Sequence, residues 1–96
     1  MKTARVIGSV VSTMKVEDLR GSKLLVLRAV APDDTFTGDP FVAVDAIGAG
    51  HGEVVLVAEG SAARHTDRTA SSPVDALIIG IIDSIEVDGQ TTFRKN

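Results

Sequence analysis

Short runs of aliphatic and β-branched residues alternate along the chain with turns rich in glycine, proline and aspartate. Valine and isoleucine lose side-chain freedom in helices and fit the pleated surface of a sheet, so these runs predict strands. The pattern predicts six short strands in an all-β domain, at Ala4–Thr13, Lys23–Val30, Val42–Ile47, Val54–Val57, Ala76–Ile85 and Gln90–Arg94.

Local signals refine this pattern. Ser61 is placed to cap one short helical turn over Gly60–Arg64. The dipeptide Asp88-Gly89 favours a tight turn, after which the chain returns as an edge strand and completes a C-terminal hairpin. Gly8 predicts a bend or bulge inside the first strand. Closure removes the exposed edges of such strands, so we expect one small closed barrel domain over residues 1–96.

The pattern is most unusual in Phe41–Glu59, where two strand-like runs flank a loop that contains Gly48, Gly50 and Gly52. The flanks predict a hairpin, and glycine allows positive φ where the chain reverses. A phosphate cradle would need a helix directly after the glycines, but Glu53–Val57 is β-branched and lacks helical spacing. We therefore favour close backbone packing at this loop, against another copy of the chain.

The composition also favours association. The chain has 96 residues, of which 44% are hydrophobic and 3% are aromatic, and its mean hydropathy is +0.21. A small domain this rich in aliphatic side chains is expected to leave apolar surface exposed, which is typical of homo-oligomers.

Several classes of function are disfavoured by what the chain lacks. The net charge is −3, and no basic cluster or aromatic platform suggests nucleic-acid binding. The absence of cysteine excludes disulfides and thiolate chemistry. No segment approaches membrane-spanning length and no cleavage signal follows the first residues, so we expect no membrane partner and a cytoplasmic protein.

Three aspartates, Asp45, Asp75 and Asp83, lie in or beside apolar strands, where a carboxylate must be paired or hydrogen-bonded. The segment Val44–Ala49 is similar to the Asp-Thr-Gly-Ala turn of retroviral-type aspartic proteases. However, no threonine or serine follows Asp45, which removes the basis for a catalytic role. We expect these acids to bind loop amides or a neighbouring arginine.

The remaining candidates for chemistry also favour a structural protein. His51 and His65 lack the spacing of a zinc site, and Glu59–Ala63 lacks the second glycine of a nucleophile elbow. Arg64 follows the glycine hairpin on a short turn, where two alternatives stay open: it pairs with an acid of the same or a neighbouring subunit, or it is a simple surface arginine. The sequence therefore predicts no catalytic residue, no metal and no cofactor.

The chain resembles the EutN/CcmL family of bacterial microcompartment vertex proteins over nearly its whole length. The matching segments are Ala4–Thr13, Gly21–Leu25, Val42–Glu53, Gly60–Arg64, Pro73–Asp75 and Ile79–Asp83. The tail Asp88–Lys95 is most similar to ethanolamine-type members, which implies a catabolic metabolosome rather than a carboxysome.

The resemblance implies a closed OB-like barrel of about five strands that assembles into cyclic pentamers. These pentamers close the vertices of a polyhedral shell in the cytoplasm, beside hexameric shell proteins, and they are not enzymes. The residues expected at the pore or axis are Gly48, Ala49, Gly50, His51 and Gly52. The residues expected at the subunit interface are Asp45, Glu53, Ser61, Arg64, Asp75 and Asp83.

One alternative function stays open at this point. An OB-like barrel could hold a nucleotide or another small ligand at the loop Gly48–Gly52, although fold alone does not determine function. The shortage of basic and aromatic residues argues against this alternative.

Overall fold

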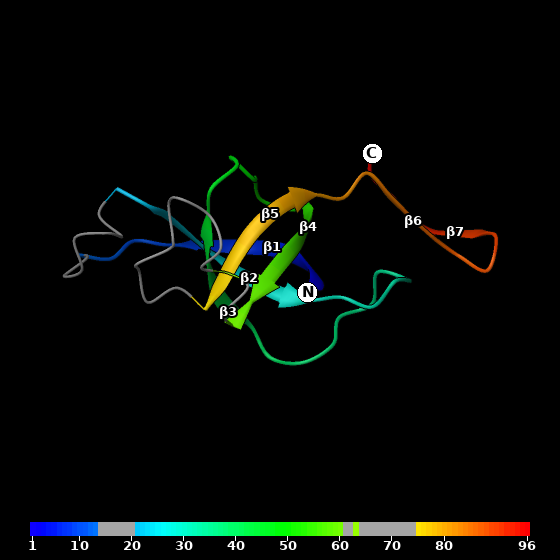
Figure 1. Ribbon diagram of the computed structural model, residues 1–96, viewed down its shortest axis with the longest axis horizontal. Coiled ribbons are helices and arrows are strands. Elements are labelled where there is room, and N and C mark those ends of the chain that lie inside the picture. The colour runs from blue at the N-terminus through cyan, green and yellow to red at the C-terminus, as the bar shows by residue number, and fades with distance from the viewer. Residues whose placement is uncertain (14–20, 61–62, 64–74) are drawn as a thin grey trace.

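The computed structural model describes residues 1–13, 21–60, 63 and 75–96 (Figure 1). Within these ranges the chain forms seven strands, one more than the hydrophobic pattern predicts. They are β1 (Lys2–Val10), β2 (Lys23–Ala29), β3 (Phe41–Asp45), β4 (Val54–Glu59), β5 (Ala76–Ile81), β6 (Ser84–Val87) and β7 (Gln90–Arg94).

Five of the strands close into a barrel, with the order β1-β2-β3-β5-β4. The pairing of β3 with β5 is parallel, and the other four pairings of the barrel are antiparallel. The prediction of an all-β fold built on a small closed barrel is therefore confirmed. The predicted helical turn over 60–64 lies mostly outside the described residues.

The first strand contains the predicted irregularity. Its register against β2 shifts by one residue between Val6 and Gly8. A bulge of this kind bends the strand and increases its twist, which helps a short sheet to close on itself. The prediction of a bend or bulge at Gly8 is therefore confirmed.

The predicted hairpin over Phe41–Glu59 is wrong. β3 and β4 follow one another along the chain, but β5 lies between them in the barrel. The loop before β4 is bound to β1 instead, because Gly52 N donates to Val6 O and Val6 N donates to Glu53 O, both at 2.9 Å. These bonds direct β4 toward β1 and leave the other edge of β3 for β5.

The expected single strand over Ala76–Ile85 is also divided in two. β5 ends at Ile81, and the chain leaves the barrel before β6 begins at Ser84. β6 pairs with β7 as a separate two-stranded sheet around the turn at Asp88-Gly89, as the turn residues predict. The hairpin extends away from the barrel (Figure 1).

The core fills the interior of the barrel with aliphatic side chains from all five strands. It contains Ala4, Val6, Leu25, Leu27, Ala43, Ala49, Val55, Val57, Ala76 and Ile78. A second, smaller cluster joins Val44, Ala63 and Leu77, with Leu24 packed against it. Strands that bury both of their faces require apolar residues at consecutive positions, which explains the unbroken aliphatic runs.

None of the described residues form a helix long and apolar enough to cross a membrane.

Candidate functional site

The glycine loop, residues 46–53, links the end of β3 to the start of β4 and is the strongest candidate site. Its first glycine, Gly48, has φ +84°, and Gly52 has φ +85°. Residues that carry a side chain rarely adopt this left-handed backbone conformation, so both positions favour glycine strongly. Gly50 lies outside that region, but an added Cβ would come within 3.3 Å of Glu53 Oε1. The expectation of positive φ therefore holds at two of the three glycines.

A buried carboxylate organises the beginning of the loop. Asp45 Oδ1 accepts hydrogen bonds from the amides of Ile47 and Gly48, each at 3.1 Å. The Asp45 side chain is only 1% exposed, and the Lys23 ammonium lies 3.7 Å from its Oδ2. Lys23 also donates to Ala49 O at 2.9 Å. The prediction that this acid binds loop amides is confirmed.

A second carboxylate organises the end of the loop. Glu53 Oε1 accepts a hydrogen bond from the Gly50 amide at 2.6 Å, and Glu53 Oε2 lies 3.1 Å from the Lys95 ammonium. The bond from Gly50, followed by the bond from Lys95, lowers the pKa of Glu53 below its ordinary value because both favour the charged form. Glu53 therefore connects the glycine loop to the C-terminal segment.

Arg5 makes a third connection, from β1. Its guanidinium donates to Gly52 O at 2.5 Å and pairs with Asp34 Oδ1 at 2.5 Å. The central carbon of this guanidinium, Cζ, lies 5.8 Å from the centre of the Phe93 ring, within the range of a cation–π contact. Arg5 thus joins the glycine loop, the loop before β3 and the C-terminal strand.

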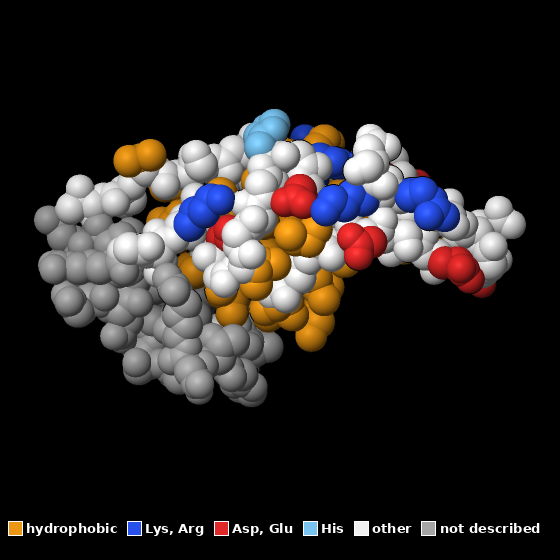
Figure 2. All heavy atoms as spheres, turned by 90° about the horizontal axis from the view of Figure 1, so that it is seen from above, with side chains coloured by type: hydrophobic (Ala, Val, Ile, Leu, Met, Phe, Trp, Pro, Cys, Tyr) orange, Lys and Arg blue, Asp and Glu red, His pale blue; other side chains and the backbone are white. Residues whose placement is uncertain are grey.

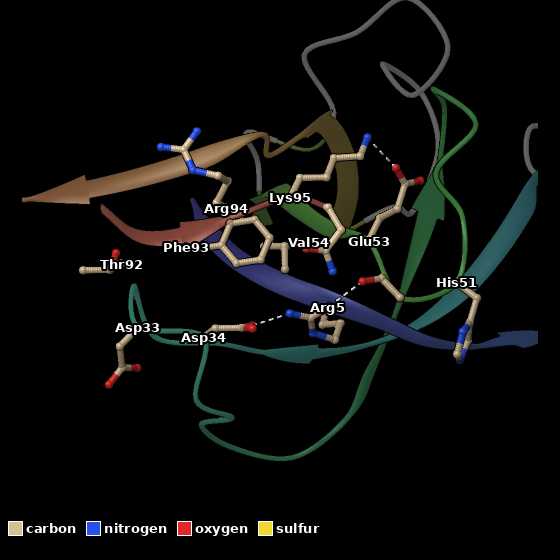
Figure 3. A pocket seen from close by; sticks show the side chains of 12 residues that line it. Arg5, Asp33, Asp34, His51, Glu53, Val54, Thr92, Phe93, Arg94 and Lys95 are labelled. Atoms are coloured by element: carbon tan, nitrogen blue, oxygen red, sulfur yellow. Dashed lines mark hydrogen bonds and ion pairs between the residues drawn. The ribbon is translucent and has the colours of Figure 1, made fainter. Parts of the chain in front are cut away.

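These contacts line a groove of about 520 Å³ between the barrel and the C-terminal segment (Figure 3). Its charged side chains include the two ion pairs Arg5–Asp34 and Glu53–Lys95. His51 lies apart from both pairs, at one end of the group of side chains that Figure 3 shows. Among the described residues, no three acidic, histidine or cysteine side chains are arranged to hold a metal. The groove is therefore a polar junction between two parts of the fold.

The structure brings the predicted axis residues together, since all five belong to the one loop. Among the predicted interface residues, Asp45 and Glu53 brace that loop from inside. Asp75 and Asp83 lie exposed at the two ends of β5 and accept backbone bonds, from Gly60 N and Lys95 N respectively, both at 2.8 Å. Ser61 and Arg64 lie outside the described residues. The assignments to an axis and an interface stay predictions.

Arg5 and Lys95 are the residues that the sequence did not point to. Arg5 stands between two inward-pointing residues of β1, Ala4 and Val6, so the alternation of the strand places it outside the barrel. Nothing in the sequence indicates which loop lies beside it there. Lys95 follows the last strand, and its partner Glu53 is far away along the chain.

A family model described as "Ethanolamine utilisation protein EutN/carboxysome" matches residues 1–83. The chain belongs to the EutN/CcmL family. The matched region contains the whole barrel and the glycine loop and ends directly before β6. The family predicted from the matching segments is therefore confirmed.

Individual relatives agree with this family. The chain is 45% identical over 95 residues to the carboxysome shell vertex protein CcmL of Thermosynechococcus vestitus, covering 99% of this chain and 96% of that protein. It is 42% identical over 95 residues to the microcompartment shell vertex protein EutN of Escherichia coli K12, and the alignment covers 99% of this chain and 100% of that protein. These relatives are named as shell proteins, and the prediction of a structural protein rather than an enzyme is confirmed.

A solved structure extends the similarity to three dimensions. The pentameric microcompartment shell protein GrpN of Rhodospirillum rubrum superposes with a TM-score of 0.82 at 44% identity. The alignment covers 91% of this chain and 99% of that one. A carboxysome subunit, CcmL, superposes with a TM-score of 0.92 at 41% identity and covers 100% of both chains, so carboxysome and other microcompartment members share this barrel.

Proposed function

We propose that this chain forms a cyclic homopentamer that caps a vertex of a bacterial microcompartment shell. The observation that carries the proposal is the similarity, in both fold and sequence, to the pentameric shell protein GrpN. A ring forms when one surface of each copy binds a different surface of the next with a fixed rotation. The shell lies in the cytoplasm, and hexameric shell proteins surround each vertex as partners.

The glycine loop is the part of the chain that we assign to the fivefold axis. A loop at a narrow axis favours small residues, because five identical large side chains would crowd each other there. Four of the five residues 48–52 are glycine or alanine, and His51 is the exception. The loop must also hold its shape, and here Asp45, Glu53 and Lys23 fix the loop from three directions. Asp45 holds the loop from inside its own subunit, and we assign the other predicted interface residues, Glu53, Ser61, Arg64, Asp75 and Asp83, to the region where neighbouring barrels meet.

The solution mass is the first test of the pentamer. Five copies of the 10.0 kDa chain give about 50 kDa, which light scattering coupled to size exclusion measures directly. A mass of one or two chains would contradict the ring. Co-expression with a hexameric shell protein then tests the vertex, since closed polyhedral shells should form with this chain and open sheets or tubes without it.

His51 tests the position of the loop. Its side chain is exposed, so His51→Asp should leave the subunit fold intact but place five carboxylates around the proposed axis. Their repulsion should weaken the ring at low salt and fade at high salt. Val11→Asp is the matched control, because Val11 is 100% exposed and lies outside the loop. Equal ring stability of the two variants at low salt would contradict the axial position.

We further infer that the shell is a catabolic metabolosome rather than a carboxysome. The support is the resemblance of the tail Asp88–Lys95 to ethanolamine-type members. Expression in two bacterial strains tests this, one with a metabolosome and one with a carboxysome, each deprived of its own vertex protein. Closed compartments should return in the first strain. Equal or better rescue of the carboxysome would contradict the inference.

A further inference from the structure

His51 lies at the corner of a tight turn in the glycine loop. Glu53 N donates to Gly50 O at 3.2 Å, which closes a four-residue turn with His51 and Gly52 as its central residues. Gly52 has φ +85°, the positive value that the third residue of a type II turn requires. The turn therefore sets the position from which the exposed His51 side chain extends into solvent (Figure 2).

The backbone on both sides of His51 is held in place. On one side, Glu53 Oε1 accepts a hydrogen bond from Gly50 N at 2.6 Å. On the other side, Gly52 is bonded to β1 through its amide at 2.9 Å and through its carbonyl, which accepts from Arg5. The turn is thus preorganised, so a ligand bound by His51 would restrict little more than the torsions of that side chain.

The His51 imidazole has no partner within its own subunit. Across the described ranges, no hydrogen bond, ion pair or ring contact includes it. Both ring nitrogens are therefore available to a ligand. The charged side chains near the loop form neutral pairs, such as Arg5–Asp34 and Glu53–Lys95. These pairs add no net positive charge that would repel a bound cation.

We propose that the His51 side chains of five copies form one shared site for a divalent transition-metal ion such as Zn²⁺. The inference rests on the proposed ring and on the axial position of the glycine loop, and it adds a ligand to them. Five imidazoles that meet at an axis crowd one another when nothing binds between them, whereas a metal ion uses their proximity for coordination. Each copy alone offers one ligand at this position, so the site is incomplete without its partners.

The chemistry of the donor favours zinc and related ions. Imidazole suits zinc, nickel and copper, whereas magnesium and calcium prefer oxygen ligands. Zinc needs only three or four protein ligands, which five copies supply. An ion that binds the ring and not the separate chains favours assembly by mass action. At a free zinc concentration about 100 times its Kd, the equilibrium constant for assembly should therefore rise about 100-fold.

Calorimetric titration of zinc into the purified full chain tests the site. The sequence has two histidines, His51 and His65, so His51→Ala and His65→Ala form a matched pair of variants, although His65 lies outside the described residues. The natural protein and His65→Ala should each bind one zinc ion per five chains. His51→Ala should lose this binding, and an excess of Mg²⁺ should not compete for it.

The solution mass of the same samples separates this proposal from the ring itself. A mass near five chains, with one zinc ion per five chains that His51→Ala abolishes, supports the shared site. The same mass with no zinc binding, or with binding that His51→Ala leaves unchanged, would overturn the site and leave the ring standing. One zinc ion per chain would also overturn it, because each subunit would then bind its own ion. A mass of one chain with and without zinc would contradict both proposals.

Discussion

In the barrel each of the five strands has two hydrogen-bonded neighbours, whereas β6 and β7 of the hairpin have one each. The barrel surrounds a core in which Leu27 and Ile78 are 0% exposed, while the hairpin leaves Val87 at 41%. The barrel therefore obtains its stability from residues that it supplies itself. The hairpin is joined to it by polar contacts at one end, through Glu53, Lys95 and Arg5.

This difference separates a unit that supports itself from one that does not. A closed barrel holds its shape through its own core, whereas a two-stranded sheet outside it is only marginally stable by itself. The contacts at the root of the hairpin therefore matter more to its position than any core of its own.

The largest effect is expected in the barrel core. Leu27→Ala removes a side chain that is 0% exposed and leaves a cavity, which should lower the free energy of unfolding by about 2–5 kcal/mol. Val11→Ala, at a position that is 100% exposed, should change it by less than about 0.5 kcal/mol. Denaturant unfolding at one protein concentration measures both. Similar losses in the two variants would mean that the core described here does not dominate stability.

A smaller effect is expected at the buried cap of the glycine loop. Asp45→Ala leaves the amides of Ile47 and Gly48 without their acceptor, and such a loss costs about 1–3 kcal/mol. Hydrogen exchange of these two amides should accelerate more than exchange in β1. Asp45→Asn, which keeps an acceptor oxygen, should retain more of their protection. Unchanged exchange in the alanine variant would show that the cap does not order the loop.

Backbone conformation predicts a contrast between two glycines of the loop. Gly48→Ala places a side chain at φ +84° and should cost about 1–2 kcal/mol. Gly50→Ala needs only a small shift of the Glu53 carboxylate, since its Cβ would approach Oε1 at 3.3 Å, so its cost should be lower. Thermal unfolding of the two variants measures the order. The reverse order would mean that contact at Gly50 outweighs backbone strain at Gly48.

The smallest effect is expected at the joint between the loop and the hairpin. Folding lowers the pKa of Glu53 below its ordinary value of 4.5, so the charged carboxylate stabilises the folded protein above pH 4.5. This contribution is lost as the pH falls through the lowered pKa. Glu53→Gln should therefore be less stable than the natural protein near neutral pH. The two should converge well below pH 4.5. Thermal unfolding across this range checks the sign.

Lys95→Met provides the matched control for this joint. It keeps the hydrogen bond from Gly50 to Glu53 and removes the ion pair alone. Its effect at neutral pH should be smaller than that of Glu53→Gln and should shrink further at high salt, because an exposed ion pair contributes little and is screened. A larger effect of the lysine variant would mean that Lys95, rather than the hydrogen bond from Gly50, is the main cause of the lowered pKa of Glu53.

Much of the local structure could be predicted because it depends on neighbouring residues. The β-branched runs form strands, the dipeptide Asp88-Gly89 forms the turn of the hairpin, and the shift at Gly8 forms a bulge. Asp45 binds the amides two and three residues ahead of it, which is a contact within one short segment. In each case the residues that decide the conformation lie within a few positions of one another.

The partners of the strands could not be predicted in the same way. Every strand offers the same backbone donors and acceptors, so the run of residues in β3 does not specify whether β4 or β5 lies beside it. The hydrophobic run over Ala76–Ile85 continues past the end of the barrel strand at Ile81. The run is divided where β4 no longer lies beside it to form backbone hydrogen bonds, and the hydrophobic pattern does not contain that information.

The sequence by itself determined the family, the strand-forming segments and the glycines that the loop requires, because these depend on residue type and short spacing. Only the tertiary structure decided that Arg5 meets Gly52 and Asp34, and that Glu53 meets Lys95. Those contacts join residues far apart in the chain, and they exist because barrel closure brings β1, the glycine loop and the C-terminal segment to one place. The same closure left β6 and β7 outside the barrel, since its five strands already use each other's edges.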